Sequence, residues 1–433
     1  MPKSSRPQLA LILVLLFSVP SPSYGDHWPC WRGPQGDGTS EDTNVALEWN
    51  GETGHNILWK TPLDGEGHSS PIVWQDRIFV TACAESTNQR MLTCVDRNTG
   101  KPIWQRNVLT AGLESKHALN SYASSTPATD GELVYVSFFE RSDEQVWAPN
   151  VGGERKIYTG KIVVAAYDFN GHQKWLVRPG NFLSAHGLAS SLLIYNEMLI
   201  VNGDHDGESY LAALDKQTDE EIWRTPRRHK TRSYCTPLIR RVNGRTQMVL
   251  SGSKCLAGFD PNTGNRIWHI EGPTEQFVAS MVYANGQFFA VGGYPTHHVI
   301  AVRPDGKGDV TESHVAWHKQ NVRCYVPSPV VVGKYLLVAD DRGTANCFDT
   351  KTGERLWQSR LGKHFSASLV TANGLVHFLA DDGIMTIVRP GAKPDVVATN
   401  KLGEDAYSSP AIANGQLIIR GAQHLVCIAS SDR

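Results

Sequence analysis

The side chains best suited to chemistry or ligand binding are aromatic, imidazole and guanidinium groups that each precede a short β-prone run. They are His68, Tyr122, His186, Arg232, Tyr234, Arg323, Tyr325, His364 and Tyr407. Such groups stack on ligand rings and form hydrogen bonds with polar ligands or peptides. No Ser-His-Asp order, paired-carboxylate spacing or phosphate-binding glycine loop can be identified in the sequence. We therefore expect these positions either to bind a ligand or to pack against one another.

These positions recur because each lies just before a small hydroxyl residue that begins a repeat. The hydroxyl residue, usually followed by proline, occurs at Ser70, Thr126, Ser191, Thr236, Ser280, Ser328, Ser368 and Ser409. The clearest copy, Ser328–Arg360, contains four β-prone runs separated by turn residues. A period of roughly 40–50 residues is typical of propeller blades. The sequence therefore predicts an all-β fold, an eight-bladed β-propeller of four-stranded antiparallel blades.

In such a propeller the first strand of each blade is innermost, so residues just before it surround the mouth of the central channel. An Asp-turn-Gly step followed by Trp completes most repeats, as at Asp349, Gly353 and Trp357. Ile57–Leu63 is similar to a fourth strand without a blade, whereas the last unit, Tyr407–Ile428, has only three strands. We expect the N-terminal strand to complete the last blade and close the ring.

One repeat carries a long insertion. Residues 140–160 in the second unit contain Trp147 and Tyr158, and we expect this excursion on the same side as the channel mouth. Loops of this length are often functional or mobile.

The first 25 residues are predicted to be a signal peptide. Lys3 and Arg6 form a basic start, Leu9–Val19 is apolar, and Ser23–Gly25 is a small-residue cleavage site. The apolar run is shorter than the roughly 20 residues of a transmembrane helix. We expect residues 26–56 to form an extended N-terminal segment and residues 57–433 to form the propeller. The protein is then periplasmic or secreted, without a transmembrane segment.

The charge balance bears on the partner. Lys and Arg total 42 and Asp and Glu total 43, which gives a formal net charge of −1. A near-neutral chain lacks the basic excess that binds phosphate backbones, so no nucleic-acid partner is expected. We expect a monomer that binds a protein, a polar small molecule or a glycan.

The eight cysteines do not define a disulfide framework. Cys94, Cys347 and Cys427 share one third-strand position at which other repeats have Ala or Gly, which predicts buried thiols. The sequence leaves open whether Cys83 and Cys94 form a disulfide. Pairing also stays open among Cys30, Cys83, Cys235, Cys255 and Cys324.

A metal site is not expected. The sequence Asp204–Glu208 is similar to a calcium loop, but its alternating ligands are incomplete. Equivalent Asp-Gly hairpins occur in later repeats, where that pair favours a tight turn.

The repeats resemble the pyrroloquinoline-quinone-type propeller repeats. The match lies in a third strand ending in an Asp-like step, then Thr-Gly, then a Trp strand, as in Ala213–Asp215, Phe259–Gly264 and Phe348–Gly353. The segments 28–40 and 121–127 further resemble exported propellers common in planctomycete-type bacteria. The superfamily contains quinoprotein alcohol dehydrogenases and non-catalytic scaffolds similar to the outer-membrane assembly factor BamB. These motifs specify the fold more strongly than an activity.

The resemblance implies different sites for these two classes. The dehydrogenases share a vicinal Cys-Cys pair over the quinone and a calcium ion beside a catalytic Asp, and this sequence has no Cys-Cys. We therefore predict an exported non-catalytic scaffold that binds through the channel mouth and needs no cofactor. One alternative is an oxidoreductase that uses pyrroloquinoline quinone with calcium. A further alternative is a carbohydrate-active enzyme.

Overall fold

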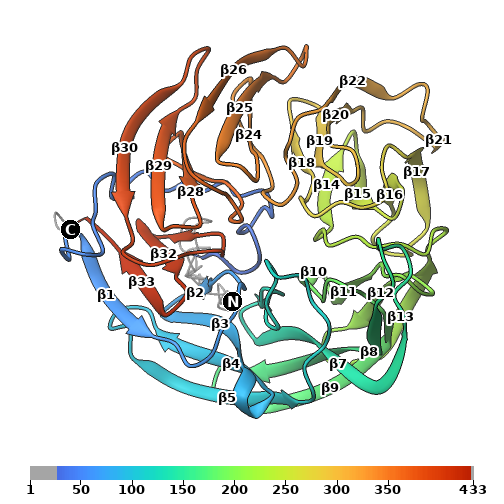
Figure 1. Cartoon of the computed structure of the whole chain (residues 1–433), viewed down its shortest axis with the longest axis horizontal. Helices are drawn as coiled ribbons and strands as arrows, with labels where there is room; N and C mark the ends of the chain where they lie inside the picture. The colour runs from blue at the N-terminus through green and yellow to red at the C-terminus, as the bar shows by residue number, and fades with distance from the viewer. Residues whose placement is uncertain (1–26, 431–433) are drawn as a thin grey trace, which may run out of the picture.

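The computed structural model describes residues 27–430 as eight β-sheets set like blades around a central axis (Figure 1). The strands of each sheet follow chain order from the axis outward, apart from the strand that closes the ring. The predicted eight-bladed propeller is confirmed. The predicted signal peptide, residues 1–25, lies outside the described residues.

The strands of the first four blades, from the inside outward, are as follows: blade one, β2 (Ile72–Trp74), β3 (Arg77–Ala84), β4 (Gln89–Asp96) and β5 (Pro102–Thr110); blade two, β6 (Ala128–Thr129), β7 (Leu133–Trp147), β8 (Lys156–Asp168) and β9 (Gln173–Phe182); blade three, β10 (Leu193–Tyr195), β11 (Met198–Gly203), β12 (Tyr210–Asp215) and β13 (Glu221–Pro226); blade four, β14 (Leu238–Val242), β15 (Arg245–Gly252), β16 (Cys255–Phe259) and β17 (Arg266–Glu271).

The strands of the remaining blades are as follows: blade five, β18 (Val282–Ala284), β19 (Gln287–Gly292), β20 (His298–Val302) and β22 (Val315–Gln320); blade six, β23 (Val330–Val332), β24 (Tyr335–Ala339), β25 (Thr344–Asp349) and β26 (Arg355–Arg360); blade seven, β27 (Val370–Ala372), β28 (Leu375–Leu379), β29 (Ile384–Arg389) and β30 (Asp395–Lys401); blade eight, β31 (Ala411–Ala413), β32 (Gln416–Arg420), β33 (His424–Ile428) and β1 (Ile57–Pro62). The helical content of residues 27–430 is one short 3-10 turn, Glu85–Thr87, so none of it forms a helix that would span a bilayer.

The N-terminal strand closes the ring as predicted. β1 pairs antiparallel with β33, from Ile57 opposite Ile428 to Pro62 opposite His424. The first and last parts of the chain therefore share blade eight, and the edge that β33 would otherwise expose is paired.

The small position in the third strands lies opposite the Trp of the fourth strand. Cys94, Cys347 and Cys427 pair with Trp104, Trp357 and Trp59. In blade four the same position is Gly258, where an added Cβ would lie 2.3 Å from Nε1 of Trp268. A large side chain would therefore displace the indole.

The cysteines are present as thiols. None of the eight, which all lie within residues 27–430, forms a disulfide. Burial raises the pKa of the Cys94 thiol to about 12, so it stays protonated at neutral pH. The predicted buried thiols at the repeat position are confirmed.

Most fourth-strand Trp residues also bond directly to the next blade. Trp59 of blade eight donates its indole N–H to the Arg97 carbonyl of blade one, 2.8 Å away. The adjacent Gly100 has a φ of 71°, and a Cβ there would lie 2.6 Å from the Trp59 ring. Equivalent bonds to the next blade are made by Trp104, Trp175, Trp223, Trp317 and Trp357. The repeated Asp-turn-Gly step thus forms the receptor for the Trp of the preceding blade.

Blade four departs from the predicted four strands. A short strand, β21 (Gly308–Asp309), from the insertion between β20 and β22 pairs parallel with β17 and adds a fifth strand. The insertion replaces the regular turn of blade five, so Trp268 donates to the buried Gln247 Oε1 at 2.7 Å instead. The Gln247 amide then donates to the Pro304 carbonyl at 2.9 Å, which restores the link to blade five.

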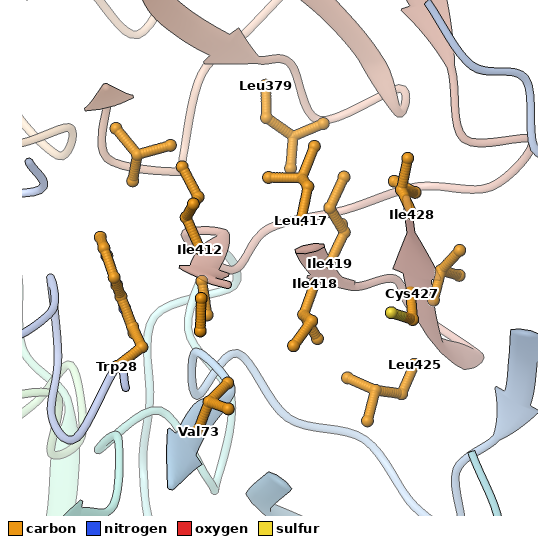
Figure 2. Packing of buried hydrophobic residues seen from close by; sticks show 14 of the residues in the cluster. Trp28, Val73, Leu379, Ile412, Leu417, Ile418, Ile419, Leu425, Cys427 and Ile428 are labelled. Carbon is orange, nitrogen blue, oxygen red and sulfur yellow. The ribbon is translucent and has the colours of Figure 1, made fainter. Parts of the chain in front are cut away.

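The hydrophobic core lies between neighbouring blades. The cluster around blade eight combines residues of blades seven, eight and one with Trp28 from the N-terminal segment. Figure 2 shows Trp28 and Val73 on one side of Ile412, Leu417 and Ile418. Each sheet therefore buries both faces against its neighbours, which four strands alone cannot do.

Residues 28–40 cross the channel beneath the innermost strands. Trp28 pairs with Val73 of blade one, and the Gly38 carbonyl accepts a hydrogen bond from Thr371 of blade seven. Asp37 forms a 2.6 Å ion pair with Arg240 of blade four. The segment thereby connects blades on opposite sides of the ring and forms a floor across one end of the channel.

Candidate functional site

The hydroxyl residues that mark the repeats join the innermost strands in a ring. The backbone N–H of Ser70 donates to Thr126 Oγ1 of the next blade at 2.9 Å. The same contact continues from Thr126, Ser191, Thr236, Ser280, Ser328 and Ser368, each to the hydroxyl of the following blade. The regular blade-to-blade bond places the residues just before each hydroxyl at the channel mouth.

A cavity of about 600 Å³ occupies the channel above the floor. Trp31 from the N-terminal segment and side chains from all eight blades line it. Seven of the nine predicted mouth residues are among them: His68, His186, Arg232, Tyr234, Tyr325, His364 and Tyr407. The structure therefore gathers these residues around one space rather than packing them into a solid plug.

Two predicted mouth residues lie outside the cavity lining. The Tyr122 ring packs instead against Lys116, whose Nζ is 4.9 Å from the ring centroid, and against Arg90. Arg323 is exposed between the buried residues Val322 and Cys324, because alternating side chains of an extended segment point to opposite sides.

Several lining residues were missed by sequence reasoning. Tyr294 and Asp341 lie in the hairpins between second and third strands, which reach the same end of the propeller as the mouth. Their position between the second and third strands of a repeat could have been used to assign them to the mouth from the sequence. Trp31 had no such signal, since the repeat pattern does not extend to the N-terminal segment.

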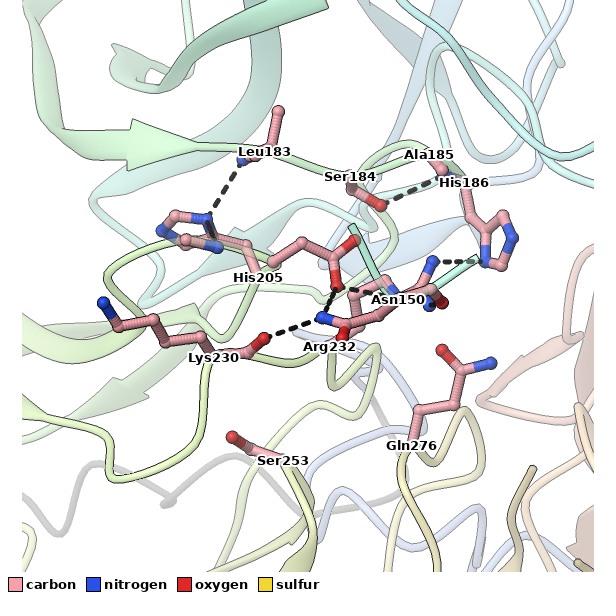
Figure 3. Close-up of polar contacts among 12 residues, drawn as sticks. Asn150, Leu183, Ser184, Ala185, His186, His205, Lys230, Arg232, Ser253 and Gln276 are labelled. Carbon is pink, nitrogen blue, oxygen red and sulfur yellow. Dashed lines mark hydrogen bonds and ion pairs between the residues drawn. The ribbon is translucent and has the colours of Figure 1, made fainter. Parts of the chain in front are cut away.

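The long hairpin of blade two bends to the mouth, on the side expected from the sequence. Its tip contributes Asn150, Val151, Gly152 and Arg155 to the lining. Nδ2 of Asn150 donates to Asp206 Oδ1 at 3.0 Å and to the Lys230 carbonyl at 2.9 Å (Figure 3). Arg232 Nη2 donates to the Asn150 carbonyl at 2.6 Å, so the tip is fastened to blades three and four.

The acidic residues of the calcium-like sequence pair with basic side chains, the two aspartates with arginines and Glu208 with Lys230. Asp204 lies 2.8 Å from Arg227 Nε, and Asp206 lies 3.3 Å from Arg232 Nε. In residues 27–430 no group of three or more His, Cys, Asp or Glu is arranged to hold a metal ion. Burial raises the pKa of Asp206 to about 6, against the opposing effect of Arg232.

Two imidazoles of the lining, His186 and His68, are neutral at pH 7. His186 Nδ1 lies 3.0 Å from the Tyr234 hydroxyl and 3.5 Å from Arg232 Nη1. Burial first, and then the charges of Arg232, His117 and Arg155, lower the pKa of His186 to about 4. Burial and the nearby Arg420 likewise lower the pKa of His68 to about 4. Neutral imidazoles can both donate and accept hydrogen bonds to a ligand.

A His-Asp-Ser group, formed by His364, Asp381 and Ser366, is not arranged to activate the serine as a nucleophile. Asp381 Oδ2 lies 2.6 Å from His364 Nδ1 and accepts a 3.0 Å hydrogen bond from the Ser366 hydroxyl. Both residues bond to the carboxylate, whereas an activated serine would bond to the imidazole. The carboxylate therefore orients two lining groups.

The cavity does not fit a calcium-bound quinone. Calcium takes six to eight oxygen ligands, usually with several carboxylates. Asp341 supplies the single carboxylate in the lining, and its Oδ1 already accepts the Val326 N–H at 3.2 Å. No mechanistic step through such a cofactor follows from these residues.

Comparisons with known proteins point to one family. A family model described as outer membrane protein assembly factor BamB matches residues 39–140, 141–359 and 296–389. Outer membrane protein assembly factor BamB of Burkholderia pseudomallei (strain K96243) is 31% identical over 345 residues, which are 74% of this chain and 84% of that protein.

Solved structures share the propeller fold. BamB from Moraxella catarrhalis has a TM-score of 0.59 at 14% identity, over 86% of this chain and 99% of that chain. Quinohemoprotein alcohol dehydrogenase ADHIIG from Pseudomonas putida HK5 has a TM-score of 0.55 at 10% identity, over 94% of this chain and 80% of that chain. At such identities the two likenesses bear on the fold alone.

Proposed function

This chain belongs to the family of outer membrane protein assembly factor BamB, and from that premise we propose that it is an exported, non-catalytic scaffold that binds a protein partner at its channel mouth. The observation that carries the proposal is the convergence of seven mouth residues on one cavity of about 600 Å³. Cavities of roughly 300–1,000 Å³ lined by aromatic and a few polar groups are typical ligand sites.

The chemistry of the lining favours binding over catalysis. Its one carboxylate, Asp341, has no second carboxylate in the lining to share acid-base work, and Ser366 is bonded to Asp381 rather than to His364. Exposed apolar side chains at the rim, Leu119 and Tyr294, offer contact surface to a polypeptide. By its family, the partner belongs to the assembly of outer membrane proteins.

Photo-crosslinking in cells tests this proposal. A benzophenone amino acid replaces Tyr294, which lines the cavity and is 53% exposed, or Val396, which is 48% exposed on the outer strand β30. We expect a defined protein adduct from position 294 that is missing from position 396. The proposal is wrong if position 294 yields no adduct, or if both positions yield the same ones.

A further inference from the structure

The cavity is closed at one end, and that limits what it can admit. Trp31 lines the cavity from the segment that crosses the channel, and Arg32 Nη2 holds this segment to the Pro329 carbonyl at 2.5 Å. A polypeptide therefore cannot thread through the ring. A ligand can enter only from the open end of the cavity.

One wall of the cavity carries uncompensated positive charge. Arg155 at the hairpin tip donates to the Ala185 carbonyl but has no carboxylate partner within residues 27–430. Arg232 is matched by Asp206, and both Arg232 and Arg155 lie close enough to His186 to lower its pKa. An anionic group of a ligand bound here would supply the negative charge that the protein itself does not place beside Arg155. A neutral glycan would leave Arg155 unmatched.

Another part of the lining offers acceptors and amphipathic groups. Asp341 Oδ1 accepts the Val326 N–H, whereas its Oδ2 makes no hydrogen bond with the described part of the chain. The Tyr325 hydroxyl accepts a 2.9 Å hydrogen bond from Gln276 Nε2 and presents its ring to the cavity. These groups suit backbone N–H donors and side chains of an extended peptide.

Building on the proposed function, we propose that the cavity binds the C-terminal end of a partner polypeptide, with its terminal carboxylate at Arg155. A carboxylate has the two acceptor oxygens that a guanidinium fork recognises. The last residues then lie along the Tyr325 and Asp341 side, and the chain leaves past Leu119 and Tyr294 at the rim. Capture of a terminal carboxylate is a known mode of peptide recognition.

Matched peptides test the carboxylate directly. A pool of N-acetylated tetrapeptides is prepared both as free acids and as C-terminal amides, and retention by the full-length protein is measured by ultrafiltration and mass spectrometry. We expect free acids to be retained about tenfold or more above amides, the range that a charge-assisted hydrogen bond provides. Arg155→Ala should abolish this preference, and Arg155→Lys should keep part of it.

Arg389→Ala is the matched control, since Arg389 is an exposed arginine at the turn between β29 and β30 at the other end of the propeller. It should leave the preference unchanged. Equal retention of acids and amides contradicts the inference, as does loss of the preference in Arg389→Ala. Citrate in excess tests whether the site binds a small carboxylate and not a peptide end. If citrate displaces every peptide, the site recognises a bare carboxylate and the inference is again wrong.

The outcome is separable from that of the proposed function. If crosslinks form at position 294 but acids and amides are retained equally, the scaffold role stands and the C-terminal inference fails. If free acids are preferred but no crosslink forms in cells, the ligand class stands and the scaffold role fails.

Discussion

Single hydrogen bonds at the repeated residues couple each blade to the next. Asp349 Oδ1 accepts the backbone N–H groups of Lys351 and Thr352, both at 3.0 Å, and so shapes the turn. The turn then presents the Thr350 carbonyl, which accepts the Trp317 indole N–H at 2.8 Å. The residues that carry the family resemblance are thus occupied in blade packing, which explains why they specify a fold and not an activity.

Gln247 provides a test of this coupling at one residue. Gln247→Leu keeps the side-chain volume but leaves the buried Trp268 N–H without a partner, and the Pro304 carbonyl keeps only its hydrogen bond from Arg245 Nη2. An orphaned buried donor costs about 1–3 kcal/mol, so we expect a clear fall in melting temperature by calorimetry. Gln358→Leu on the exposed side of β26 is the control and should change stability by about 0.5 kcal/mol or less. Equal changes in melting temperature for the two variants would show that the hydrogen bonds through Gln247 contribute nothing to stability.

The sequence located most of the candidate site because the repeat sets it. A residue just before an inner strand is placed by the hydroxyl ring, so His186 and Tyr325 could be assigned to the mouth from the pattern alone. Arg323 could not, because a shift of one residue in an extended segment turns a side chain away from the channel. Arg155 and Asn150 come from a hairpin tip whose position depends on contacts with Asp206 and Lys230, which are distant in sequence.

At the scale of elements, regular blades were predictable and the irregular ones were not. The Trp strand at Ile57–Pro62 and the incomplete last repeat are complementary, and together they predicted ring closure. β21 has only two residues and pairs with the preceding blade, so no local periodicity in the sequence predicts it. The floor depends on contacts such as Arg32 with Pro329, 297 residues apart, for which a repeat pattern holds no information.

Two neighbouring residues of β1 test the closure of the ring. Trp59 is 9% exposed and packs against blade one, whereas Leu58 is 51% exposed on the other face. Trp59→Ala should cost about 3–5 kcal/mol, because it removes a buried aromatic and the bond to Arg97. Leu58→Ala should cost about 0.5 kcal/mol or less. Thermal unfolding of both variants measures the difference, and similar melting temperatures would contradict the role of β1.

At the scale of the whole molecule, a continuous ring with one closed end combines rigidity with a single entrance. The cores lie between blades, so the loss of one interface weakens two sheets at once. Neutral histidines are buried within the same ring: burial lowers the pKa of His377 and of His205 to about 4. Protonation of such groups links the stability of the propeller to pH.

His377 makes this dependence measurable. Its ordinary pKa of 6.5 falls to about 4 in the folded state, where it is 3% exposed on β28. The unfolded chain binds the proton first, so the stability is present above pH 6.5 and is lost as the pH falls toward 4. At pH 5 the loss amounts to about 2 kcal/mol. His377→Leu removes the titrating group in an apolar setting, so its melting temperature should fall less between pH 7 and pH 5 than that of the wild type. Parallel profiles of the two proteins would show that another group governs the acid sensitivity, since only the titration of His377 distinguishes them.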